Sequence, residues 1–171
     1  MNKNKIWLVV VGLIIGGYFF ASSASTKDNT NRDVNGKIQE SGDLGSLTIK
    51  VGDCMNDVPS IEYGKTKSIE KVTGVPCSGS HHWEAYASTN STLTAFTDEA
   101  VIKEAEEFCA SDAPFSFLKS LPVDRQNQIA TIYGEADSIY IAPSVDSFNT
   151  DKSIVCLIGS NAKYYTGSIK D

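Results

Sequence analysis

An uncharged apolar run over residues 6–21 separates the N-terminus of this chain from everything that can form a water-soluble fold. A run of this kind is typical of an export or membrane segment. Lys3 and Lys5 precede it and favour a cytoplasmic N-terminus, which places the rest of the chain outside the membrane. We therefore expect an extracytoplasmic protein, held in the cell membrane by a single span over residues 6–21 or secreted.

Two interpretations of residues 1–24 stay open. A signal peptide would be cleaved after Ala24, because Ser22 and Ala24 put small residues at the −3 and −1 positions. An uncleaved anchor would place Trp7 and Tyr18 near the two ends of the span, where interfacial aromatic residues are favoured. We favour the anchor.

Residues 25–46 contain few apolar side chains, so they predict a flexible, disordered linker. The folded, extracytoplasmic domain is then expected over residues 47–171, within the size range of one domain. The chain has 21 acidic and 15 basic residues and a net charge of −6. This balance argues against nucleic acid as a partner, because nucleic-acid binders need a basic face.

The order of apolar patterns in the expected domain predicts an α+β fold, with a mostly antiparallel sheet and one main helix. Thr97 is expected to cap that helix, with Asp98 and Glu99 in its first turn and its end near residue 111. A short second helix is expected over residues 115–119. Strands are expected over residues 47–51, 69–76, 82–88, 128–133, 138–142 and 153–158.

The chain has four cysteines, Cys54, Cys77, Cys109 and Cys156. An even number in an exported protein favours two disulfides, and four cysteines allow three pairings. We prefer Cys54–Cys77, at the ends of neighbouring strands, and Cys109–Cys156, between the main helix and the last strand. The spacing contains no CxxC, which argues against thioredoxin-type exchange and against a zinc ribbon.

The segment VGDC at 51–54, followed by VPCS at 75–78, His81 and Glu84, resembles the septum-formation domain of actinobacterial envelope proteins. In that family a helical cysteine and a last cysteine on a terminal strand follow, and Cys109 and Cys156 fit those places. Before the last cysteine, Phe148 stands where the family tends to carry tryptophan. The resemblance implies a membrane-tethered or secreted envelope protein linked by name to cell division, and it implies no enzymatic reaction.

The densest group of chemically active side chains is His81, His82, Trp83 and Glu84. A histidine and Glu84 could form an acid–base pair or part of a metal site, but zinc needs three or four ligands and the chain has two histidines. The simpler interpretation is that His81 fixes the turn after Cys77, with Glu84 as its partner. We therefore predict no metal and no cofactor, and name His81, Trp83 and Glu84 as candidate binding residues.

Two functions follow as hypotheses. The first is a non-catalytic binding or structural module of the cell envelope, whose partner is an envelope or cell-division protein. The alternative is an envelope hydrolase that uses His81 and Glu84. The sequence leaves the question of enzymatic activity open.

Overall fold

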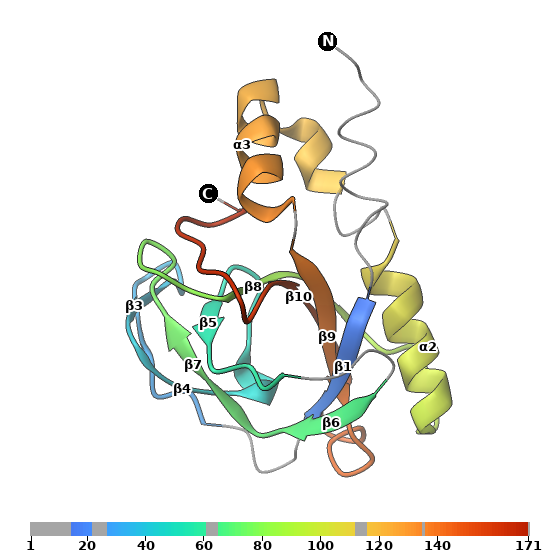
Figure 1. Cartoon of the computed structure of the whole chain (residues 1–171). Coiled ribbons are helices and arrows are strands. Elements are labelled where there is room, and N and C mark those ends of the chain that lie inside the picture. The colour runs from blue at the N-terminus through green and yellow to red at the C-terminus, as the bar shows by residue number, and fades with distance from the viewer. Residues whose placement is uncertain (1–14, 22–26, 61–64, 112–115, 135, 171) are drawn as a thin grey trace.

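The computed structural model describes residues 15–21, 27–60, 65–111, 116–134 and 136–170 (Figure 1). Its centre is an 8-stranded sheet with the strand order β4-β7-β5-β8-β10-β9-β1-β6. Neighbours from β4 to β9 pair antiparallel, whereas β1 is parallel to both β9 and β6. The strands are β1 (Ile15–Ala21), β4 (Gly42–Gly45), β5 (Cys54–Asn56), β6 (Thr66–Ile69), β7 (Lys71–Val75), β8 (Trp83–Asn90), β9 (Asp137–Pro143) and β10 (Ser153–Gly159). The fold is therefore α+β, with a mixed sheet.

The sheet curls so that its two ends approach each other. Strand β6 is the last strand at one end, and β7 is the second strand at the other end. Because Glu70 alone separates β6 from β7 in the chain, these two ends must lie close together. In Figure 1, β6 and β7 follow each other along the lower side of the molecule. The curled sheet encloses an apolar core that includes Phe19, Leu44, Met55, Trp83 and Leu157.

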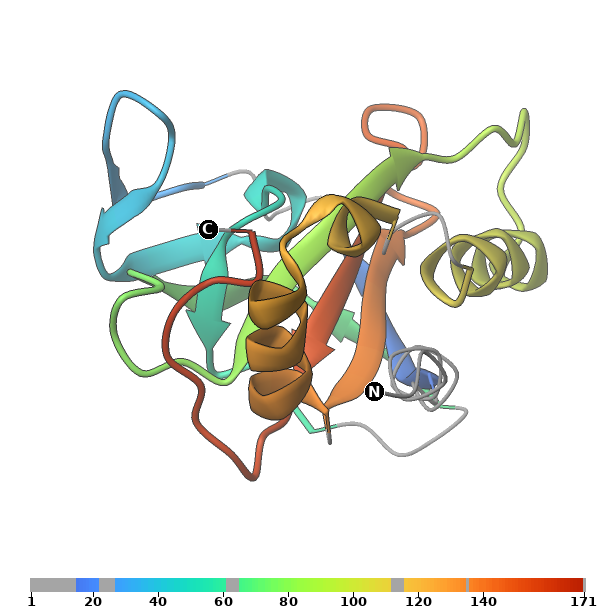
Figure 2. The same ribbon diagram turned by 90° about the horizontal axis from the view of Figure 1, so that it is seen from above.

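The outer face of the sheet carries a second core, which lies under helices α2 (Asp98–Cys109) and α3 (Val123–Tyr133). Along β10, Val155 and Leu157 belong to the enclosed core, whereas Cys156 and Ile158 belong to the outer one. This alternation follows from the two-residue period of a strand. Since both of their faces are buried, β9 and β10 have apolar interiors. Figure 2 shows the C-terminal segment passing beside α3.

Both predicted disulfides are confirmed. Cys54 pairs with Cys77, and Cys109 pairs with Cys156. The second bond ties α2 to β10 within the outer core, where both cysteines are buried. The main helix is also confirmed: the Thr97 side chain accepts a hydrogen bond from the Ala100 amide, and Val101, Ala105 and Cys109 form the buried face.

The sequence prediction is wrong for two segments. Residues 47–51 were expected to be a strand, but Ser46–Thr48 form the 3-10 helix η1. Residues 128–133 were expected to be a strand, but they lie in α3, which places Ile129 and Tyr133 one turn apart on its buried face. Pro122 precedes this helix and Gly134 ends it, which are the residue types that favour helix boundaries. The short helix expected over 115–119 corresponds to η2 (Ser116–Ser120), a 3-10 helix.

The predicted linker is also corrected, because residues 27–46 are folded. They contain the hairpin of β2 (Asn31–Arg32) and β3 (Ile38–Glu40), followed by β4. Ile38 and Leu44 are buried in the enclosed core. A Cβ atom on Gly74 of β7 would come within 2.8 Å of the Thr30 side chain, so the hairpin packs directly on the sheet. A few well-placed apolar residues are enough here because the sheet supplies the rest of the contact area.

The predicted membrane segment overlaps β1. Residues 15–21 pair on both sides in the sheet, and Phe19 and Ala21 are buried. A segment in a sheet cannot at the same time span a bilayer as a helix, so these are alternative conformations of residues 15–21. Residues 6–14 and the predicted cleavage point after Ala24 lie outside the described residues. In the described part of the chain, no helix is long and apolar enough to cross a membrane.

Candidate functional site

The predicted binding residues lie at the start of β8, inside the molecule. His81 and Glu84 have no exposed surface, and Trp83 is 4% exposed. The backbone of His81 forms an antiparallel bridge with Tyr165 of the C-terminal segment. Glu84 and Trp83 point to opposite faces of the sheet, because they are neighbours on a strand. The three side chains therefore do not form one exposed surface.

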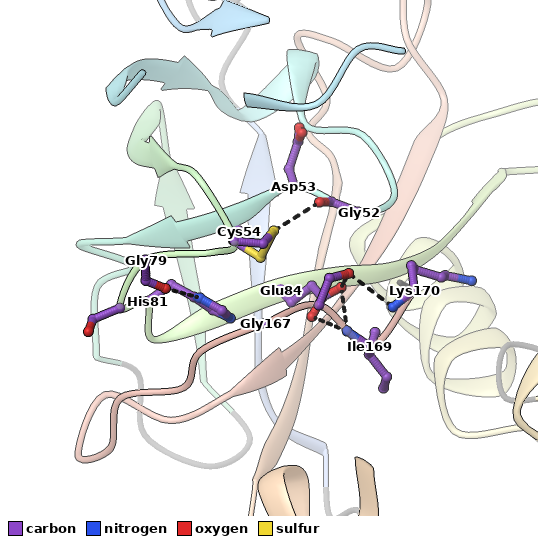
Figure 3. The surroundings of a disulfide bond; sticks show 12 residues. Gly52, Asp53, Cys54, Gly79, His81, Glu84, Gly167, Ile169 and Lys170 are labelled. Atoms are coloured by element: carbon purple, nitrogen blue, oxygen red, sulfur yellow. Dashed lines mark hydrogen bonds between the residues drawn. A yellow bond between two sulfur atoms is a disulfide. The ribbon is translucent and has the colours of Figure 1, made fainter. Parts of the chain in front are cut away.

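Glu84 holds the C-terminal segment against the sheet (Figure 3). Its Oε1 accepts hydrogen bonds from the Ser168 hydroxyl at 2.6 Å and from the Ile169 amide at 3.0 Å. Its Oε2 accepts from the Ile169 amide at 2.8 Å and from the Tyr133 hydroxyl at 2.8 Å. A buried carboxylate is tolerated only when such donors surround it. Both oxygens of Glu84 are thus used to join β8, α3 and the C-terminal segment.

His81 reaches Glu84 through Tyr133 rather than directly. His81 Nδ1 lies 3.1 Å from the Gly79 carbonyl, so the neutral ring carries its proton on Nδ1 and donates to the turn after Cys77. His81 Nε2 lies 3.3 Å from the Tyr133 hydroxyl. Burial lowers the pKa of His81, and the nearby His82 lowers it further. His81 is buried and neutral, and its Nδ1 is bonded to the Gly79 carbonyl, so it is a structural residue of this turn.

The electrostatics of Tyr133 agree with a structural network. Burial and the neighbouring Glu84 carboxylate raise the pKa of Tyr133, because both disfavour a phenolate. Its ring stacks on Tyr165, with the ring centroids 4.8 Å apart. The hydroxyl proton therefore stays on Tyr133 and is donated to Glu84, the nearer acceptor. We call Glu84, Tyr133, His81 and Ser168 the Glu84 network.

Trp83, one of the candidate binding residues, is packed rather than exposed. Its indole ring lies in the enclosed core, and its Nε1 donates to the Asn161 side chain at 2.7 Å. His82 is at the edge of the fold, where its Nδ1 lies 2.8 Å from the Lys163 carbonyl and its ring contacts Tyr164. The alternative pair of His82 and Glu84 is therefore not formed.

One set of potential metal ligands involves the predicted site. Ligand atoms of Cys54, His81 and Glu84 lie within 4.8 Å of one another, and all three residues are buried. Cys54 is bonded to Cys77, so it offers no thiolate. His81 and Glu84 are held by the hydrogen bonds of the Glu84 network. With the disulfide intact, this arrangement lacks the ligand set that a structural zinc ion needs.

A cavity of about 580 Å³ lies beside the Cys54–Cys77 disulfide, on the side reached by solvent. Four segments meet there: the β2–β3 loop, the turn before β5, residues 76–78 and the C-terminal segment. Three lysines, Lys37, Lys50 and Lys170, are in its lining. We call this space the lysine-lined cavity. It touches the Glu84 network through Ser168, whose hydroxyl is bonded to Glu84.

Asp53 is the one acidic residue among the described residues that line this cavity. Arg32 binds both oxygens of the Asp53 carboxylate, at 2.6 and 2.9 Å, and also binds Asp28 at 2.7 Å. The hydrogen bond to Asp53 raises the pKa of Arg32, despite partial burial. Arg32 thereby offsets the charge of Asp53 and fixes the β2–β3 hairpin. The lysines consequently dominate the charge of the cavity.

Sequence reasoning missed Tyr133, Ser168 and the three lysines. Tyr133 lies beside His81 only because residues 123–133 form a helix. Ser168 contacts Glu84 only because the C-terminal segment folds back on the sheet. The signal available in the sequence was weak: a buried glutamate needs donors, but the sequence does not say which ones.

No protein-family model matches this chain, and comparison with curated proteins and with solved structures gives no significant match.

Proposed function

We propose that this protein is a non-catalytic binding module of the cell envelope. The main observation in its support is that all four cysteines are paired in two disulfides. Disulfides form and persist in oxidising compartments outside the cytosol, which agrees with the export signal expected over residues 6–21. Because of the resemblance to the septum-formation domain, we further propose that its partner is an envelope or cell-division protein.

The alternative of a hydrolase gains no support from the geometry. A general acid–base pair must be within reach of its substrate, and His81 and Glu84 are both fully buried. Their polar atoms are occupied by Gly79, Tyr133, Ser168 and Ile169. A binding role at the solvent-facing lysine-lined cavity is favoured over chemistry at the Glu84 network.

Residues 15–21 cannot be strand β1 and part of a membrane anchor at the same time. When residues 6–21 serve as a membrane anchor, β1 is withdrawn from between β9 and β6. When the chain is cleaved after Ala24, β1 is lost altogether. Either route exposes the edges of β9 and β6, which need another cover, because unpaired strand edges are prone to association.

The experiment is fractionation of cells that express the full chain with a C-terminal tag, together with determination of the N-terminal residue. We expect the chain in the membrane fraction with residues 1–24 retained, and both disulfides formed. A chain that begins after Ala24 in the medium supports the secreted form. A full-length chain with reduced cysteines in the cytosol would contradict the proposal.

The division role is tested separately by following an export-compatible fluorescent fusion through the cell cycle, with crosslinking at the site of enrichment. Enrichment at mid-cell is expected if the partner is a cell-division protein. An even distribution around the envelope would contradict the link to division while leaving the envelope location intact.

A further inference from the structure

We propose that the lysine-lined cavity binds a small organic phosphate, such as a phosphate monoester. The inference concerns the ligand of a surface cavity and does not depend on where in the cell the protein resides. Three properties of the cavity support it: its positive charge, the lysine ammonium groups in its lining, and its volume.

The charge of the cavity is opposite to that of the protein. Lys37, Lys50 and Lys170 line it, while the Asp53 carboxylate beside them is bound by Arg32 at 2.6 and 2.9 Å. The whole chain has a net charge of −6. A concave positive site on an acidic molecule attracts a small anion that fits inside it. An extended polyanion must also lie along the acidic surface, where it is repelled.

The donor types favour phosphate over a single carboxylate. A planar carboxylate is recognised best by the fork of an arginine, whereas lysines act as point charges that suit the tetrahedral oxygens of phosphate. Arg32 already uses its fork on Asp53, and its other bonds go to Asp28 and the Gly36 carbonyl. The cations of the cavity are therefore ammonium groups from three separate segments, which can surround a phosphate from different directions.

The size favours an organic ligand over a free phosphate ion. The cavity has about 580 Å³, which lies in the usual range of about 300–1,000 Å³ for small-molecule sites. Its lining combines the lysines with apolar groups: Ile38, Val51, Pro76 and the Cys54–Cys77 disulfide. A phosphate group can therefore contact the lysines while an apolar body packs on Val51 or Pro76.

Two features keep the cavity in shape without a ligand. The β2–β3 loop is held by Arg32, which joins Asp28, Asp53 and the Gly36 carbonyl. The C-terminal wall is held by Glu84, which binds Ser168 and Ile169. Burial lowers the pKa of Lys170, while attraction from Glu84 opposes that change. A largely preformed site binds without a large ordering cost.

The test is a titration of the purified full chain at pH 8, followed by calorimetry, with phenyl phosphate as the probe. Phthalate is the control of equal charge, and inorganic phosphate is the control without an apolar body. We expect phenyl phosphate to bind more tightly than either control. Lys50→Ala and Lys170→Ala should each weaken it about fivefold or more. Lys103→Ala, which removes an exposed lysine from α2, should leave the affinity unchanged.

Each contrary result overturns the proposal in a defined way. Phthalate binding as tightly as phenyl phosphate would contradict the preference for phosphate. An equal loss of affinity in Lys103→Ala would show a general charge effect without a site. Binding to vesicles that contain phosphatidylglycerol, without binding to phenyl phosphate, would show that the protein recognises lipid headgroups in a membrane surface and not a small phosphate ester. Absence of binding to all probes by a chain whose melting temperature is normal would contradict the site altogether.

Discussion

The Glu84 network and the lysine-lined cavity lie on two sides of the same disulfide and use their polar groups differently. In the network, both carboxylate oxygens of Glu84 and the Nδ1 of His81 have partners inside the protein, and neither residue has exposed surface. In the cavity, Lys37, Lys50 and Lys170 line a space that is open to solvent. The buried region uses its polar groups to stabilise the fold, whereas the lysines of the open region lie where a ligand can reach them.

Removing the Cys54–Cys77 disulfide is expected to have the largest combined effect on stability and ligand binding, because this bond lies in the wall between the two regions. The double variant Cys54→Ala/Cys77→Ala should lose about 3 kcal/mol of unfolding free energy, from the chain-entropy estimate for a closed loop of this length. The measurement is chemical denaturation followed by fluorescence. The variant should also bind phenyl phosphate more weakly, because the cavity wall is loosened.

The matched control for that variant is Cys109→Ala/Cys156→Ala. Its longer loop predicts a loss of about 4 kcal/mol, but this bond lies in the outer core, away from the cavity. At a temperature where it remains folded, its affinity for phenyl phosphate should be unchanged. If both double variants weaken binding equally, the disulfide beside the cavity has no special role there.

Glu84→Gln is expected to rank next. The amide can accept at one atom only, and its NH2 group would face the Ile169 amide or the Tyr133 hydroxyl, both of which donate to Glu84. Leaving buried donors without acceptors costs about 1–3 kcal/mol. Hydrogen exchange should show faster opening of residues 165–170. A stable variant with an unchanged C-terminal segment would contradict the structural role of Glu84.

Tyr133→Phe should cost less, about 1 kcal/mol, because it removes one of the donors to Glu84 and preserves the stacking on Tyr165. Denaturation measured alongside Glu84→Gln tests the coupling directly. The effect of the double variant should be smaller than the sum of the two single effects, because both changes break the same hydrogen bond. Additive effects would mean that Tyr133 and Glu84 act independently.

The pH dependence of stability tests the contribution of a single group, His81. Because the pKa of His81 is lowered in the folded state, the unfolded chain binds the proton more readily. Stability is therefore fully present above the unfolded pKa of about 6.5 and falls as the pH drops below it, by at most about 1.4 kcal/mol per pH unit. Denaturation midpoints from pH 8 to 5 should show a shallower decline in His81→Gln. An identical decline in both proteins would exclude His81 as its source.

The parts of the fold that could be predicted are those with local signals. The main helix has its cap at Thr97 and acids in its first turn, and β9 and β10 have strongly apolar interiors. The Cys109–Cys156 disulfide followed from the placement of its cysteines on the main helix and β10. Residues 128–133 were predicted as a strand because their side chains suit one. Pro122 and Gly134, however, favour helix boundaries on either side of this segment.

The parts that could not be predicted depend on contacts between distant segments. The segment over 27–46 has too few apolar residues to fold alone, but Arg32 is fixed by Asp53 and Ile38 is covered by the sheet. The candidate residues His81 and Glu84 belong to one buried network, whose connections the sequence predicted only in part. The turn-fixing role of His81 agrees with its bond to Gly79, whereas the contact with Glu84 passes through Tyr133, which no sequence pattern connects to either residue.

We propose that Glu84 and His81 stabilise the fold rather than catalyse a reaction. The most direct measurement compares the unfolding free energy of the full chain with that of His81→Ala, together with an assay for hydrolysis of envelope material. We expect the unfolding free energy of the variant to be lower by about 1–3 kcal/mol, and we expect no hydrolysis by either protein. A variant that is as stable as the original chain but has lost a hydrolytic activity would contradict it.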